Sequence, residues 1–417
     1  LHHFSVWIPR SAQGRSKVTI TIPPVAVVST DSTDTLGTST STSEIPTETT
    51  VPEGPVEIII AAVGDVTTDR RIRLSVFDPE TGQRDFRPVL APVRPYLEAA
   101  DYTVCNLETP LAGPEAGYND GPLVNSPDSL AEALASAGVD LATTANSHSL
   151  DMDWQGLVGT LDRLDRAGVA HVGTYRSLEE KSTPFIVDIE GIQVAFLSYT
   201  AGLNGRESPS GRAAYAVNTL DVDAVAKEAM TARMWGADVV IALLHFGNEY
   251  SREPSDRQTE VAEGSREVEG LLSRGVDVIL GAHSHMVQPI VKVLQYSAWR
   301  ARDTYVAYSL GNFLSGERWR YSDSGIIAYV HIEKDGLRTR VTGISYLPVY
   351  MQMALDGDDT DYRILPVFPG LVPDSDADLE ELDENRMDQV WEELSALLYR
   401  PDEGIVPLNP FEIRTEP

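Results

Sequence analysis

The sequence predicts an α/β fold, and three observations support that prediction. Short, continuous apolar runs of the kind that form buried strands occur at intervals along the chain. Segments with helical spacing of apolar residues lie between many of these runs. Polar residues follow several runs directly, and the exits of parallel strands meet at one edge of a sheet. We therefore expect the functional site at that edge.

Composition excludes several classes of protein. The chain has 417 residues, 42% of them hydrophobic, which is ample for a core. Its formal charge of −30 argues against a nucleic-acid binder and against docking on anionic lipid through basic residues. The one cysteine, Cys105, rules out an internal disulfide framework and a cysteine-based zinc site. We expect it to be a small core residue.

Residues 1–55 are expected to be a disordered segment that ends in a linker. The stretch 29–55 is dominated by Ser, Thr, Asp, Glu and Pro, and such a composition cannot bury enough surface to fold. No run of eighteen apolar residues occurs, so a transmembrane helix is not predicted within this chain. A linker of this kind is typical of extracellular or cell-surface proteins, and we expect a tether to the membrane through a segment that this chain does not contain. Residues 56–348 are predicted to form the main domain, and 349–417 a C-terminal extension.

The first half of the main domain contains three strands with polar exits. The run 56–63 ends in Gly64–Asp65, the run 102–105 leads into Asn106–Leu107–Glu108, and the run 139–144 leads into Ala145–Asn146–Ser147–His148, with Asp151 close behind. Helices are predicted over 128–137 and over 156–167, the second with Leu157, Leu161 and Leu164 as its apolar stripe.

The second half repeats this alternation. Strands are predicted over 192–197, 238–244, 275–280 and 305–310, with helices over 222–235 and 257–274. The runs 326–332 and 338–346 predict a hairpin that turns near Lys334–Asp335–Gly336. Beyond them, the acidic stretch 374–393 predicts an amphipathic helix packed on the main domain. Its expected apolar stripe is Leu379, Leu382, Val390, Leu394 and Leu397.

The eight histidines are distributed unevenly. His2 and His3 lie near the N-terminus, and four others follow strand-like runs: His148, His245, His283 and His285. His171 and His331 lie within apolar strands and are interpreted as ordinary sheet histidines. The His-x-His pair at 283 and 285 directly follows a strand, so both imidazoles can turn toward one point. Neutral imidazole is the commonest protein ligand for transition metals.

The residues collected at the strand exits have the chemistry of a metal site. Carboxylate, amide and imidazole ligands without thiolate suit Mn, Fe, Zn or Mg ions. The set is too large for one ion and about right for two that share a bridging carboxylate, which together could activate water and hold a phosphate or amide oxygen. The alternative is that these side chains only cap strands and helices. The candidates are Asp65, Glu108, Asn146, His148, His245, His283 and His285, with Glu249 and Asn312 as further members.

Six motifs, taken in order, resemble one known family. They are Gly64–Asp65, Asn106–Leu107–Glu108, Ala145–Asn146–Ser147–His148, His245–Phe246–Gly247–Asn248–Glu249–Tyr250, Gly281–Ala282–His283–Ser284–His285 and Ser309–Leu310–Gly311–Asn312–Phe313. Together they are similar to the CapA/PgsA capsule synthesis family, which is linked to poly-γ-glutamate. The resemblance covers about residues 57–332. That family is related to calcineurin-like metallophosphoesterases, which implies a four-layer α/β/β/α sandwich that holds two metal ions.

The resemblance also implies roles for individual residues. Asp65 and His285 would bind the first metal, Glu108 would bridge, and Asn146, His245 and His283 would bind the second. His148 would be the catalytic acid or electrostatic partner of the scissile group. Arg70, Glu249 and Asn312 would contact substrate or support the metal ligands. Two positions depart from the related proteins: Thr67 replaces the histidine common in metallophosphoesterases, and Ser147 replaces an asparagine common in the capsule family.

Three functions are consistent with these features. The first is a cell-surface protein with two divalent metal ions that acts in synthesis, export or anchoring of poly-γ-glutamate or another anionic polymer, alongside membrane synthase subunits. Such a protein could be a metal-dependent hydrolase of phosphoester or amide bonds. The second is a metallophosphoesterase for small phosphoesters, and the third is a non-catalytic polymer-binding or assembly protein.

Overall fold

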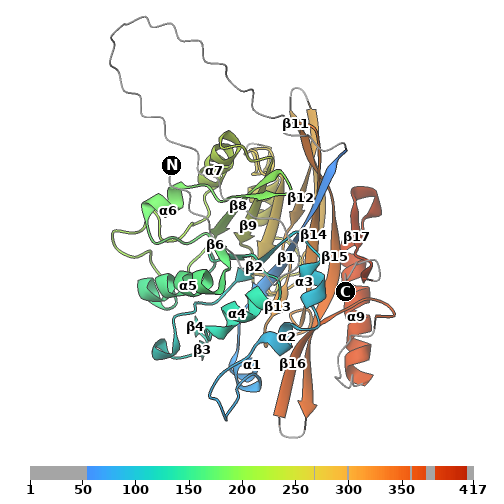
Figure 1. Cartoon of the computed structure of the whole chain (residues 1–417). Helices are drawn as coiled ribbons and strands as arrows, with labels where there is room; N and C mark the ends of the chain where they lie inside the picture. Colours follow the sequence, from blue (N-terminus) through green and yellow to red (C-terminus); the bar gives the residue numbers. More distant parts are fainter. Residues whose placement is uncertain (1–53, 267, 298–299, 357–358, 372–380, 411–417) are drawn as a thin grey trace, which may run out of the picture.

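Two β-sheets pack face to face, and helices cover their outer faces (Figure 1). The computed structural model describes residues 54–266, 268–297, 300–356, 359–371 and 381–410. Within these residues one sheet has nine strands and the other has six. Almost all of the predicted N-terminal segment, residues 1–53, lies outside the described residues.

The nine-stranded sheet, called the first sheet here, has β1 near its centre. The strand order is β16-β15-β14-β1-β2-β5-β6, with β13 beside β1 and β17 beside β15. β1 runs parallel to β2 and antiparallel to β14. The strands are β1 Val56–Val66, β2 Tyr102–Leu107, β5 Leu141–Thr143, β6 Ala170–Val172, β13 Asn312–Leu314, β14 Ser324–Asp335, β15 Arg338–Asp356, β16 Asp359–Pro366 and β17 Ile405–Pro407.

The six-stranded sheet, called the second sheet, is parallel in its middle and antiparallel at both edges. Its order is β11-β12-β10-β9-β8-β7. The strands are β7 Ile186–Ile189, β8 Ile192–Thr200, β9 Val239–His245, β10 Val278–Ala282, β11 Ile290–Ser297 and β12 Arg300–Ala307. A separate small hairpin joins β3 Asn119–Asp120 to β4 Val124–Asn125.

The helices are short except for α5, α7 and α9. They are α1 Arg70–Ser75, α2 Arg87–Leu90, α3 Arg94–Glu98, α4 Ser129–Ser136, α5 Asp153–Ala167, α6 Leu178–Ser182, α7 Val222–Met234, α8 Asp256–Ala262 and α9 Glu381–Leu398. Side chains at several helix starts accept hydrogen bonds from the first turn, including Asp221 for α7 and a Ser255–Gln258 capping box for α8. The predicted stripe of α5, Leu157, Leu161 and Leu164, is buried as expected.

Alternating side chains of β1 face two different cores. Ile58 and Ile60 point into the core between the sheets, whereas Ala61 and Val63 point into the core under α2, α3 and α4. A third core lies between the second sheet and the helices α7 and α8. Helix, sheet, sheet and helix therefore follow one another as layers, which confirms the predicted four-layer sandwich.

The predicted helix over 257–274 is wrong beyond residue 262. α8 ends at Ala262, and Gly264 has a positive φ of 93°. A Cβ atom on Gly264 would lie 2.5 Å from the backbone nitrogen of Gly270. The chain therefore folds back on itself here through two glycines in close backbone contact, which a continuous helix cannot provide. The predicted hairpin at Lys334–Asp335–Gly336 is confirmed.

The C-terminal residues continue the first sheet. β15 runs through the predicted domain boundary between residues 348 and 349, and both β16 and β17 pair with it. α9 packs beside β15, with Val390 and Leu394 buried as predicted and Leu397 partly buried. Leu382 is 76% exposed, so its predicted place in the stripe is wrong, and Leu379 lies outside the described residues.

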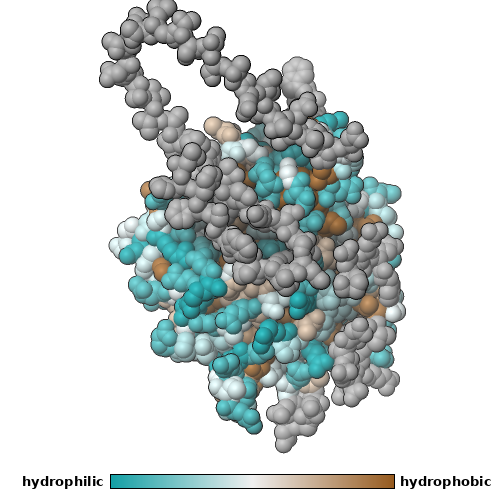
Figure 2. Space-filling view, in the orientation of Figure 1, coloured by the Kyte–Doolittle hydropathy of each residue, from teal (hydrophilic) through white to brown (hydrophobic). Residues whose placement is uncertain are grey.

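The visible surface of the domain is mostly hydrophilic, with scattered apolar residues, as expected for a strongly acidic chain (Figure 2). No helix in the described ranges is long and apolar enough to cross a membrane. Cys105 is buried as predicted, and burial raises the pKa of its thiol to about 12.

Candidate metal centre

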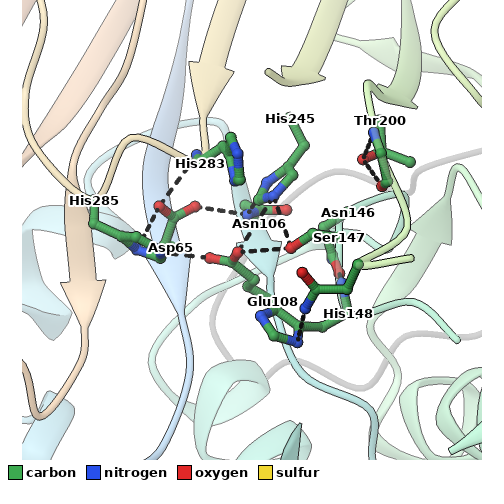
Figure 3. A network of polar contacts seen from close by, with 12 residues as sticks. Asp65, Asn106, Glu108, Asn146, Ser147, His148, Thr200, His245, His283 and His285 are labelled. Carbon is green, nitrogen blue, oxygen red and sulfur yellow. Dashed lines mark hydrogen bonds and ion pairs between the residues drawn. The ribbon is translucent and has the colours of Figure 1, made fainter. Parts of the chain in front are cut away.

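Polar side chains from both sheets meet where β1, β2, β9 and β10 end (Figure 3). Asp65, near the end of β1, and Glu108, just after β2, come from the first sheet. His245 ends β9, and His283 and His285 follow β10 in the second sheet. The structure therefore brings together five of the residues that the sequence proposed as metal ligands.

Glycines in the motifs permit the close backbone contacts that build this centre. A Cβ atom on Gly64 would lie 1.9 Å from the carbonyl oxygen of Gly311, which accepts a hydrogen bond of 3.0 Å from Asp65 N. A Cβ atom on Gly281 would lie 1.9 Å from the carbonyl oxygen of Tyr308. Side chains at positions 64 and 281 would push these segments apart.

The loop that carries the two neighbouring histidines has a strained backbone. His283 has a φ of 98° and His285 a φ of 57°, in the left-handed region that non-glycine residues rarely adopt. Contacts on both sides hold this conformation. Asp65 Oδ2 accepts from the backbone N–H of His283 at 3.3 Å, and the backbone N–H of Tyr250 donates to Ser284 O at 2.8 Å. Such strain is typical of functional sites.

The first cluster consists of Asp65, Glu108 and His285, all buried. One ligand atom from each residue lies within 4.8 Å of the others. His285 Nδ1 is 3.4 Å from Asp65 Oδ2 and 4.0 Å from Glu108 Oε2. Two carboxylates and one imidazole thus surround a common point.

The second cluster consists of Glu108, His245 and His283. His245 Nε2 is 3.3 Å from Glu108 Oε1, and the rings of the two histidines have centroids 4.5 Å apart. Glu108 belongs to both clusters and turns a different oxygen toward each: Oε1 to His245 and Oε2 to His285. This is the arrangement expected of a carboxylate that bridges two ions.

Burial and mutual charge shift the titration of the cluster residues. Burial, and then the neighbouring Asp65 carboxylate, raise the pKa of Glu108 well above its ordinary value. Burial and the surrounding histidines lower the pKa of His245 well below 6.5, and burial also lowers the pKa of His283. Burial acts in the same direction on His285, but Glu108 and Asp65 outweigh it and raise its pKa to about 9.

Two atoms of the clusters support metal binding directly. Glu108 Oε2 and His283 Nδ1 are buried and have no hydrogen-bond partner among the described residues. A buried polar atom without a partner is costly, and coordination of a cation would remove that cost. The two clusters can therefore hold divalent metal ions, and their carboxylate and imidazole donors fit such ions.

The predicted residues Asn146 and His148 lie beside the clusters. The Asn146 amide is fixed by donation from Nδ2 to Leu107 O at 2.7 Å and by acceptance from the His148 backbone N–H at 3.1 Å. His148 Nδ1 is 2.6 Å from Asp151 Oδ2 and 3.3 Å from Asn204 Nδ2. His148 is also close enough to lower the pKa of His245.

The remaining three candidates occupy different surroundings. Asn312 is buried, and its Oδ1 is 3.0 Å from His285 Nδ1. Glu249 is exposed, yet its charge partly opposes the lowering of the pKa of His283 that burial causes. Arg70 has an exposed side chain on α1, and its backbone N–H donates to Asp120. The other two histidines of the described ranges bond elsewhere, His331 to Ser345 and His171 to Asp165.

Three polar residues of the centre were not proposed from the sequence. Asn106 Nδ2 donates to Asp65 Oδ1 at 2.7 Å, and Ser147 Oγ lies 3.3 Å from His245 Nε2. Glu317 lies 3.3 Å from Asn312 Nδ2. Asn106 could have been found, because residues two apart on a strand share a face and Glu108 follows it at that spacing. Ser147 stands within a motif, but nothing in the sequence singles out Glu317.

Comparison with solved structures gives distant similarities. An NAD nucleotidase (NadN) from Haemophilus influenzae is 13% identical, with a TM-score of 0.41, and the match covers 85% of this chain and 57% of that one. The calcineurin-like phosphoesterase YfkN from Bacillus subtilis is 15% identical, with a TM-score of 0.39, and the match covers 82% of this chain and 98% of that one.

Two capsule proteins are similar in sequence. "PGA biosynthesis protein CapA" from Bacillus subtilis is 27% identical over 289 residues, which is 68% of this chain and 70% of that protein. "Capsule biosynthesis protein CapA" from Bacillus anthracis is 25% identical over 297 residues, which is 67% of this chain and 65% of that protein.

The family profile described as "Bacterial capsule synthesis protein PGA_cap" matches residues 59–317. That range contains every residue of both clusters and all six motifs. The resemblance inferred from the motifs is therefore confirmed, and the chain belongs to the PGA_cap family of bacterial capsule synthesis proteins.

Proposed function

We propose that this protein is a cell-surface component of poly-γ-glutamate capsule or exopolymer synthesis, export or anchoring, and that it is a hydrolase that requires two divalent ions. The observation that carries the proposal is the pair of buried clusters that share Glu108 at the edge of both sheets. Family membership supports the connection to capsule synthesis. The choice of poly-γ-glutamate as the polymer rests on the name of the Bacillus subtilis relative, in which it is abbreviated PGA.

Six residues would hold the ions in this proposal. Asp65 and His285 serve the first ion, Asn146, His245 and His283 serve the second, and Glu108 serves both. Two divalent ions held there would polarise a phosphoryl or amide oxygen as Lewis acids and would activate water. Asn106 fixes the Asp65 carboxylate through its 2.7 Å hydrogen bond, so that its other oxygen faces His285.

His148 is proposed to move a proton at the reacting bond. With its proton on Nδ1, the imidazole donates to Asp151 Oδ2 at 2.6 Å, and Nε2 is the nitrogen that exchanges a proton with the substrate. Asp151 is buried and also accepts from the backbone N–H of Val124, so it holds the ring in one orientation. The protonated imidazole would donate to the leaving oxygen or nitrogen. This pair supports a hydrolase over a protein that only binds polymer.

The partners follow from the same assignment. Poly-γ-glutamate or another anionic polymer would be the substrate or cargo, and membrane synthase subunits would be neighbours. Arg70 and Glu249, both with exposed side chains near the strand exits, are proposed to contact the substrate. A membrane tether is proposed to keep the domain at the cell surface.

The test begins with metal content and continues with turnover. Protein purified without chelator is analysed by mass spectrometry, and metal-loaded protein is then incubated with γ-linked glutamate oligomers and with small phosphodiesters. We expect about two equivalents of metal, and hydrolysis that His148→Ala abolishes while its metal content is unchanged. His331→Gln is the matched control, because this half-buried histidine bonds to Ser345 of its own sheet, away from the clusters.

The outcomes separate the three functions. Cleavage of γ-glutamyl oligomers supports the proposal, whereas turnover of phosphodiesters alone makes the protein a small-molecule phosphoesterase. Two bound ions without any turnover, together with polymer binding, would assign it a binding or assembly role. A deletion strain that keeps its surface polymer would contradict the capsule assignment itself.

A further inference from the structure

We propose that the amide oxygen of Asn312 is a fourth protein donor of the first cluster, and that this cluster prefers a harder ion than the second. This inference rests on the part of the proposed function in which two ions are bound. It concerns which residues hold the first ion and which metal this cluster prefers. It does not depend on whether the protein is a hydrolase.

Asn312 reaches the first cluster because β13 lies beside β1. In that parallel pairing Asn312 is the register partner of Asp65. Its Oδ1 is 3.0 Å from His285 Nδ1, which is the same nitrogen that faces Asp65 Oδ2 and Glu108 Oε2. Asn312 is 5% exposed, so this oxygen lies within the same buried space.

The hydrogen bonds of the amide nitrogen determine which end of Asn312 faces the cluster. Asn312 Nδ2 donates to the carbonyl oxygen of Ser322 at 2.9 Å and lies 3.3 Å from Glu317 Oε2. Both partners only accept, so the nitrogen must point toward them and the oxygen toward His285. Glu317 is itself held by the Tyr250 hydroxyl, 2.7 Å away. The oxygen is thus oriented before any ion binds.

On metal binding, this oxygen would stop accepting a hydrogen bond and would instead coordinate the ion. Without a bound ion, Oδ1 accepts a hydrogen bond from the N–H of His285 Nδ1. A ligating nitrogen carries no proton. The oxygen then keeps its lone pairs beside the cation, next to the two carboxylates, and has no other donor in contact among the described residues.

The two clusters then offer unequal donor sets. The first has three oxygens, from Asp65, Glu108 and Asn312, and one nitrogen, from His285. The second cluster, defined by Glu108, His245 and His283, has one oxygen and two nitrogens, and Asn146 would add at most one amide oxygen to it. Oxygen ligands suit Mn²⁺ and Mg²⁺, whereas imidazoles suit Zn²⁺. The first cluster is therefore expected to favour Mn²⁺ over Zn²⁺ more strongly than the second does.

Metal-binding measurements on Asn312→Ala test this inference. Binding of Mn²⁺ alone is followed by the paramagnetic resonance of free Mn²⁺, and binding of Zn²⁺ alone by competition with a coloured chelator. The first cluster is identified as the binding step that is missing in His285→Ala. We expect Asn312→Ala to weaken Mn²⁺ at that step about tenfold or more, to weaken Zn²⁺ less, and to leave the second step unchanged.

Equal losses for the two ions would overturn the inference, because a residue that only positions His285 affects both alike. Unchanged binding would overturn it as well. Asn125→Ala is the control, since that buried amide bonds to backbone groups away from the clusters. If Asn312→Ala does not fold, Asn312→Asp replaces it and must keep the preference for Mn²⁺. Absence of metal from the wild type would instead contradict the proposed function.

Discussion

Glu108 is the residue on which both clusters depend. Its carboxylate lies between His245 on one side and His285 on the other, in a fully buried position. Burial and Asp65 raise the pKa of Glu108. Burial lowers the pKa of His285, but Glu108 and Asp65 outweigh it and raise that pKa to about 9. At pH 7 the proton on His285 therefore occupies a place that a cation would take.

Metal affinity is expected to rise with pH. The pKa of His285 is raised to about 9, so this imidazole carries a proton at pH 7 that a ligating nitrogen must lose. Displacement of one proton predicts an apparent affinity for the first ion that rises about tenfold per pH unit up to about pH 9 and then levels off. Calorimetric titration with Mn²⁺ in buffers of different ionisation enthalpy would measure the released proton. An affinity that does not change between pH 6.5 and 9 would refute this.

Removal of the shared carboxylate is expected to reduce the amount of bound metal more than removal of one histidine does. Glu108→Gln should reduce bound metal from about two equivalents to nearly none, because each cluster loses a charged donor. His285→Ala should leave about one equivalent, because the second cluster keeps all its members. Metal analysis after dialysis against metal-free buffer distinguishes the two variants. Equal losses in both would mean that the clusters are not separate sites.

Sequence reasoning located the residues that stand at strand exits but missed those that depend on side-chain direction. Asp65, His245 and His283 follow apolar runs and could be proposed from that position alone. Glu317 could not, because it reaches Asn312 through a loop whose course no local pattern determines. Arg70 was proposed from the family resemblance, and its exposed side chain leaves that role a prediction.

At the scale of elements, helix α9 holds the loop that supports Asn312. Arg386 on α9 binds both carboxylate oxygens of Asp323, at 2.8 and 2.9 Å, and its other nitrogen lies 3.2 Å from Glu393. Asp323 directly follows Ser322, whose carbonyl oxygen holds the Asn312 amide. A helix from the C-terminal part of the chain is thus connected to the metal centre through one short loop.

Arg386→Ala is expected to destabilise the protein by about 2 kcal/mol. The paired side chains are only 16% and 12% exposed, and loss of a bidentate charged hydrogen bond at such a site leaves Asp323 without its partner. Urea unfolding followed by tryptophan fluorescence would measure the change. Arg257→Ala is the matched control, because its ion pair with Glu260 is 68% and 39% exposed. Similar unfolding midpoints for the two variants would contradict the proposed role of this contact.

The elements that the sequence predicted well are long or strongly patterned. α5, α7 and the hairpin of β14 and β15 follow from periodicity and turn chemistry. β6, β13 and β17 have three residues each, too few for any period, and are strands only because neighbours pair with them. The helix predicted beyond Ala262 was wrong because the apolar spacing continues there, although two glycines turn the chain back on itself.

At the scale of the whole molecule, the candidate metal centre draws its residues from both sheets. Each cluster takes Glu108 from the first sheet and at least one histidine from the second. The core between the sheets contains side chains from both, so the sheets already adhere without ions. Bound cations would add a second connection at the sheet edge.

Chelation is therefore expected to lower thermal stability. An ion present at a hundred times its Kd stabilises the folded state by about 2.7 kcal/mol, and two ions contribute more. Treatment with EDTA should lower the melting temperature by several degrees, and Mn²⁺ should restore it. The Glu108→Gln variant should show no such response. A melting temperature unaffected by EDTA in protein that contains metal would contradict this link between the sheets.

The central place of β1 also determines when the metal centre can form. β1 pairs with β2, the next strand in the chain, but its other neighbours are β13 and β14, and Ile58 lies opposite Ile332 of β14. The hydrogen bond between Asp65 and His283 likewise joins residues that are 218 positions apart in the sequence. Contacts so distant in sequence form slowly and late. During synthesis, the carboxylates of Asp65 and Glu108 must remain without their histidines until β10 and the loop after it have been made and the second sheet has docked. Acquisition of metal is therefore expected to be one of the last events in the maturation of this protein.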